Sequence, residues 1–79
     1  MTLKVISAEK VLFDGAVSLV TLPGAAGLFT VLENHASLVS VLTAGELEFQ
    51  AEEGGERQRM AIEGGIADVD RNVVSVCVY

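Results

Sequence analysis

The feature of this chain that most restricts its fold is an apolar period of two residues. In Glu46–Gln50, Leu47 and Phe49 alternate with polar residues, and Arg57–Glu63 continues the pattern. Strict alternation is typical of a β-strand that has one face in the core. No window has the spacing of an amphipathic helix, and β-branched residues are frequent, so the sequence predicts an all-β protein.

Three further segments have strand character. Leu3–Ile6 and Val17–Leu22 are short runs rich in β-branched and aliphatic residues. Val73–Tyr79 is apolar at almost every position, which indicates a strand that is covered on both faces or that closes a sheet.

Turn signals separate these runs. Asp14-Gly15 predicts a tight hairpin between Val11–Phe13 and the strand from Val17. The other signals are Pro23-Gly24, Ala44-Gly45, Glu53–Glu56, Gly64-Gly65 and Asp70–Asn72. Their spacing of roughly ten residues favours about nine short strands in a β-sandwich or a closed sheet.

Chain length and cysteine content restrict the organisation. The 79 residues are expected to form a single domain, residues 1–79, and 51% of them are apolar. A core of this size is small, so some apolar surface is expected to remain for a partner. Cys77 is the one cysteine and has no internal disulfide partner, which favours a reducing cytoplasm.

Charge and hydropathy exclude several classes of partner. The formal net charge of −6 argues against nucleic acid, whose binding depends on Lys and Arg at the phosphates, and against anionic lipid. The amino end lacks the pattern of a signal peptide, and no apolar run approaches the ~20 residues of a membrane span. We therefore expect no direct membrane insertion; any membrane association would come through a partner.

No residue pattern indicates catalysis, a metal or a cofactor. His35 is the only histidine, and although Ser37 lies two residues on, no acidic third member of a triad is evident. Glu46 and Glu48 could share a cation but are better explained as the exposed face of a strand. Gly24–Gly27 lacks the remainder of a phosphate-binding motif.

The segment Gly24–Gly27 is instead typical of a tight turn. Ala25, Ala26 and the following Leu28 are apolar, where polar residues are usual at a loop tip. Two interpretations are open: the loop folds back onto its own sheet, or it is buried against a partner.

Several segments together resemble the amino-terminal domain of the epsilon subunit of F-type ATP synthases. Asn34–Leu38 is similar to the family's NHAPL segment, with Ser37 where Pro is usual. The other matching segments follow in the family's order: Val5–Gly15, Val20–Leu32, Gly45, Gly64–Val69 and Asn72–Val76. The resemblance covers nearly the whole chain and implies a flattened β-sandwich of about ten short strands.

The resemblance also implies a function without catalysis or a cofactor. Such a domain belongs to the rotating central stalk, links the gamma subunit to the c-subunit ring, and helps to couple ion-driven rotation to ATP synthesis. It lies peripherally at the cytoplasmic face of the bacterial inner membrane. The expected contact residues are Gly24, Ala25, Ala26, Gly27 and Leu28 at the ring, and His35, Ala36 and Leu38 near gamma.

Two departures from the family pattern qualify this expectation. The sequence ends at Tyr79, without the helical hairpin that in many members can inhibit ATP hydrolysis, so it is either naturally short or truncated. Ala25-Ala26 is uncharged where relatives often have an acid. The alternative hypothesis is a free-standing β-sandwich that binds a small ligand or self-associates through an open edge; an enzyme using His35 is a third.

Overall fold

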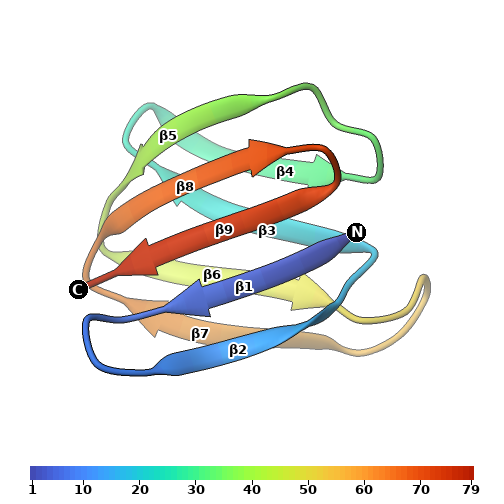
Figure 1. The fold of residues 1–79 in the computed structure, drawn as a ribbon, viewed down its shortest axis with the longest axis horizontal. Coiled ribbons are helices and arrows are strands. Elements are labelled where there is room, and N and C mark those ends of the chain that lie inside the picture. Colours follow the sequence, from blue (N-terminus) through green and yellow to red (C-terminus); the bar gives the residue numbers. More distant parts are fainter.

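A computed structural model describes residues 1–79 and contains nine β-strands and no helix (Figure 1). The strands are β1 (Thr2–Ile6), β2 (Val11–Ala16), β3 (Leu19–Gly24), β4 (Gly27–Leu32), β5 (Leu38–Leu42), β6 (Gly45–Gln50), β7 (Arg57–Ile62), β8 (Gly65–Asp70) and β9 (Val73–Val78). The predicted all-β class is confirmed, and nine strands are close to the number expected.

The strands form one mixed sheet that curls into two layers. Its order is β2-β1-β9-β8-β5-β3-β6-β7, and β4 pairs with β3 outside this path. In Figure 1, β5, β8, β9, β1 and β2 form the front layer, with β4, β3, β6 and β7 behind them. The layers are joined by one residue pair, Gly24 with Leu42, and extents of 28 × 23 × 19 Å give a flattened sandwich.

A core of fifteen buried apolar residues fills the space between the layers. It is mostly aliphatic, as the scarcity of aromatic residues requires, and no polar or charged residue is buried. The alternation in β6 places Leu47 at 0% and Phe49 at 3% exposure, so the inward direction predicted for both is confirmed. The other core residues are Leu3, Val5, Val17, Val20, Leu22, Val31, Leu42, Ile62, Ala67, Val69, Val74, Val76 and Val78.

The strand β9 differs from one of the two alternatives predicted for it. It lies inside the sheet, parallel to β1 and antiparallel to β8. Its residues alternate between buried and exposed, with Val73, Ser75 and Cys77 exposed. Coverage on both faces is therefore wrong for this chain, and the apolar residues of the second phase contribute to an outer surface.

The hairpin predicted at Asp14-Gly15 is also wrong. Both residues lie within β2, where Asp14 pairs with Lys4 and Gly15 with Leu3. The chain reverses earlier, through residues 7–10, where the Ser7 N–H donates a 2.9 Å hydrogen bond to the Lys10 carbonyl. The turn predicted at Asp70–Asn72 is present, with Arg71 and Asn72 in the left-handed conformation that suits a tight hairpin.

Candidate contact surfaces

Ala25 and Ala26 form the loop between β3 and β4. The loop is closed by the pair Gly24 and Gly27, and both alanines are exposed. Gly27 has φ of 130°, a conformation that favours glycine. A Cβ atom on Gly24 would lie 2.8 Å from the Gly27 carbonyl oxygen and 2.9 Å from the Phe29 ring. The two glycines therefore make the turn possible, and the alanines form its tip.

The main chain ties this tip to the neighbouring strand β5. The Ala25 N–H donates a 2.9 Å hydrogen bond to the Val41 carbonyl, and the Thr43 N–H donates another to the Pro23 carbonyl. The tip side chains are nevertheless exposed, and Leu28 beside them is 74% exposed. The backbone thus folds back onto its own sheet while the side chains remain free for contact. Gly24, by contrast, is buried and can act only by shaping the turn.

His35 lies in the loop of residues 33–37 between β4 and β5. Its side chain is half-buried, and its Nδ1 lies 2.7 Å from the Ala36 carbonyl oxygen, so Nδ1 is the donor. Its backbone N–H donates to the Leu32 carbonyl at 3.2 Å. Ala36 is exposed, whereas Leu38 is half-buried and packs against the core.

This loop is fixed to the turn between β8 and β9. The Asn34 N–H donates to Asn72 Oδ1 at 2.6 Å, and Asn72 Nδ2 donates to Asn34 Oδ1 at 2.9 Å. The Ser37 hydroxyl donates to Asp70 Oδ1 at 2.7 Å. Ser37 and His35 thus have different hydrogen-bond partners, whereas a nucleophile and its base need to be within hydrogen-bond reach of each other.

The tip and the His35 loop lie at opposite ends of the sandwich. Strand β5 runs between them, because Leu42 pairs with Gly24 while Leu38 directly follows the His35 loop. A separation of four residues along a strand corresponds to about 13 Å. Figure 1 shows the two loops at opposite ends of the layers. The residues predicted as contact sites therefore form two separate surfaces, not one site.

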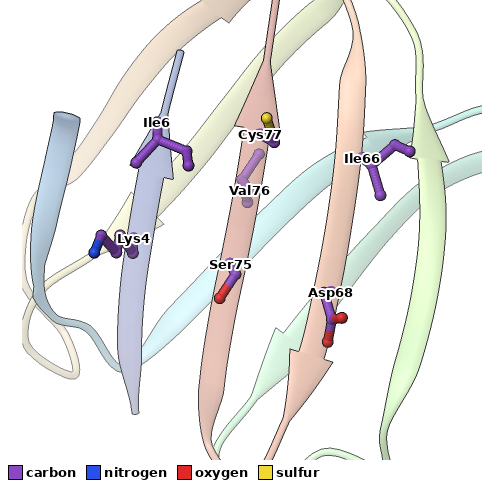
Figure 2. A pocket seen from close by; sticks show the side chains of 7 residues that line it. All are labelled: Lys4, Ile6, Ile66, Asp68, Ser75, Val76 and Cys77. Atoms are coloured by element: carbon purple, nitrogen blue, oxygen red, sulfur yellow. The ribbon is translucent and has the colours of Figure 1, made fainter. Parts of the chain in front are cut away.

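A third surface, which the sequence did not single out, covers the outer face of the front layer. Cross-strand pairing aligns Ile6, Cys77, Ile66 and Val41 in one row across β1, β9, β8 and β5. Figure 2 shows the first three at one level and Lys4, Ser75 and Asp68 at the next. These side chains and Val76 line a hollow of about 360 Å³.

The outer face of the rear layer is polar by comparison. Thr21 and Thr30 share a 2.9 Å hydrogen bond between their hydroxyl groups, and Arg59 Nε lies 3.3 Å from Glu48 Oε1. Glu48 thus pairs with an arginine beside it. The apolar face could not be found without the strand pairing; its one local signal was the apolar second phase of Val73–Val78.

The structure contains no group of three His, Cys, Asp or Glu side chains that could hold a metal ion. No helix is long and apolar enough to cross a membrane. The chemistry the three surfaces offer is contact through apolar side chains and free backbone groups.

Fold and surfaces together define a small β-sandwich domain whose exposed features are contact surfaces. The chain belongs to the family described as the ATP synthase delta/epsilon chain beta-sandwich domain, which it matches over residues 1–79. The resemblance to the amino-terminal domain of the epsilon subunit is therefore confirmed.

Individual relatives are named as ATP synthase epsilon chains. The protein of Leptospira borgpetersenii is 40% identical over 76 residues, which are 96% of this chain and 58% of that protein. That of Wolinella succinogenes is also 40% identical over 76 residues, covering 96% of this chain and 57% of its own length. The chain thus spans between half and three-fifths of the length of these relatives.

Solved structures with a similar fold belong to mitochondrial ATP synthases. A chain of the Euglena gracilis enzyme superposes with a TM-score of 0.86 at 28% identity, over 96% of this chain and 48% of that one. A chain of the Tetrahymena thermophila central stalk and c-ring gives 0.80 at 20% identity, over 99% of this chain and 62% of that one. The second likeness shows the fold alone.

Proposed function

We propose that this chain is a central-stalk subunit of an F-type ATP synthase, which links the gamma subunit to the c-subunit ring. The match of residues 1–79 to the delta/epsilon beta-sandwich family carries the proposal. In this role the chain performs no catalysis; it transmits rotation between the ring and the catalytic head. It acts as one domain, peripheral to the cytoplasmic face of a bacterial inner membrane.

The tip of the β3–β4 hairpin is the surface we assign to the ring. Ala25, Ala26, Gly27 and Leu28 are exposed, uncharged and attached to β5 through the main chain. A small, fixed, apolar tip suits contact by shape and apolar burial, which contributes about 25 cal/mol per Å² before the costs of association. Gly24 contributes by permitting the tight turn.

The opposite end is assigned to gamma. His35 and Ala36 form a loop held in place by hydrogen bonds to Asn72 and Asp70 from its neighbours. Leu38 supports the loop from the core side. Because the two ends are far apart, one domain can contact both partners simultaneously.

The proposal is tested by mixing the purified protein with a gamma–c-ring assembly and following co-migration on a sizing column. The native chain should co-migrate. Ala26→Asp should weaken binding about tenfold or more, because it places an unpaired charge in a docked loop. Ala51→Asp is the matched control, since Ala51 is exposed in the β6–β7 loop at the other end. Absence of co-migration by the native chain rejects the function; native-like binding by Ala26→Asp rejects only the placement of the tip.

A further inference from the structure

The four strands that border the two layers differ in charge. On one side of the sandwich, β2 carries Asp14 and a register shift, and β7 carries Arg57 and Arg59. Charged residues and bulges are the usual devices that keep a sheet edge from pairing with another chain. On the other side, β4 and β5 contain no charged residue and no proline. Figure 1 shows β4 and β5 bordering the same side of the two layers.

The hairpin register identifies which backbone groups of β4 are free. The pair Gly24 and Gly27 closes a two-residue loop and is of the hydrogen-bonded type, so alternate pairs beyond it are not. Pro23 confirms this phase, because it has no N–H and its carbonyl accepts from Thr43 instead of β4. Its partner Leu28 and the next residue of that phase, Thr30, therefore direct their N–H and C=O groups away from β3.

No strand pairs with β4 on that far edge. Its only ladder partner is β3, and the one hydrogen bond we find on the other side joins the Leu32 carbonyl to the His35 N–H. The side chains of the same phase are exposed, with Leu28 at 74% and Leu32 at 54%. The edge thus offers two free N–H and two free C=O groups, bordered by two exposed leucines.

We infer that β4 is a strand-addition site, at which an extended, uncharged and apolar segment of a partner subunit pairs with residues 28–32. Main-chain hydrogen bonds would supply affinity, and alternate side chains of the added strand would pack beside Leu28 and Leu32. This inference rests on the proposed function, since the partner is another subunit of the stalk.

Charge favours a different chain over a second copy. Each copy carries −6, and a net charge far from zero keeps proteins monomeric through mutual repulsion. The uncharged edge itself requires no counter-charge, so a neutral partner segment is complementary to it. The adjacent β5 supports the same side as a contact region, because Val39 is 71% exposed on it.

Amide hydrogen exchange of the native protein, alone and with the gamma–c-ring assembly, tests the inference directly. The N–H groups of Leu28 and Thr30 should exchange rapidly in the free protein and at least about tenfold more slowly in the complex. A complex that forms without this protection overturns strand addition and leaves the proposed function standing. Failure of the complex to form overturns both. Protection that rises with the concentration of the protein alone, with a dimer in sedimentation, assigns the edge to a second copy and overturns the inference.

A variant provides an independent measurement. Thr30→Pro removes an outward N–H without removing a ladder bond to β3, as proline at a sheet edge allows. It should weaken binding to the assembly about tenfold. Thr21→Val is the matched control, because it removes the same Thr21–Thr30 hydroxyl hydrogen bond and leaves the edge intact. Equal binding by the two variants contradicts the inference.

Discussion

The Ala25 N–H donates a 2.9 Å hydrogen bond to the carbonyl of Val41, and this bond fixes the tip of the β3–β4 hairpin to strand β5. Close by, Gly24 and Leu42 form the only pair that joins the two layers along the sheet. Strand β5 therefore connects the tip at one end with the His35 loop at the other. A force applied to the tip is transmitted to the far end through a strand that is hydrogen-bonded to β8 along its length.

Asn72 is predicted to be important for stability. Its side chain forms two hydrogen bonds with Asn34, and its φ is 62°, where asparagine is favoured over most residues. Asn72→Ala should lower the free energy of unfolding by about 1–3 kcal/mol, as hydrogen bonds are lost and alanine is strained at positive φ. Urea denaturation measures this change. Asn72→Gly keeps the backbone freedom and should lose less; an equal loss in both variants would show that the conformation costs nothing.

Gly65 is predicted to tolerate no side chain. A Cβ atom there would overlap with the carbonyl oxygen of Cys77 and lie 3.1 Å from the Val78 Cα. Gly65→Ala should therefore force β8 and β9 apart and lower the free energy of unfolding by about 3 kcal/mol or more. Gly54→Ala is the control: it also has positive φ but open space around it, and should cost about 1 kcal/mol. Thermal unfolding of the two variants separates steric overlap from backbone strain, and similar midpoints would contradict the overlap.

Phe13 and Phe49 are predicted to hold the two layers together on the side where β2 and β7 form the edges. Their ring centroids lie 4.3 Å apart, with one ring in each layer. Phe13→Ala should reduce stability by about 2–4 kcal/mol, a lowering of about 4–8 °C in Tm per kcal/mol. Phe13→Leu retains most of the apolar volume and should cost less than about 1.5 kcal/mol. Calorimetry that shows no difference between alanine and leucine would exclude a role for the aromatic contact.

Local sequence signals predicted the parts of the fold that depend on neighbouring residues. The alternation of Leu47 and Phe49 requires only the two-residue period of a strand, and Asp70–Asn72 carries its own turn chemistry. Ala25 and Ala26 were identified as a tip because glycines flank them. The structure supports each of these expectations with burial, backbone angles or pairing.

Other features depend on which strands become neighbours, and the sequence did not reveal them. The parallel pairing of β1 with β9 joins Thr2 to Val73, residues near opposite ends of the chain. Only this register aligns Ile6 with Cys77 and thereby creates the apolar outer row. Asp14-Gly15 misled for the same reason: its local preference for a turn is overridden by pairing with β1.

His35 is predicted to serve contact more than stability. Its side chain is half-buried, and its one hydrogen bond goes to the carbonyl of the adjacent Ala36. His35→Ala should therefore change the free energy of unfolding by less than about 1 kcal/mol, as is usual for a short-range bond near the surface. It should nevertheless weaken binding to purified gamma, measured by calorimetric titration. Ser37→Ala is the matched control in the same loop, since its hydroxyl is directed to Asp70. A His35→Ala protein that unfolds much more easily, or that binds gamma like the native chain, would assign His35 to the fold or to neither role, and the gamma surface would have to lie elsewhere on the sandwich.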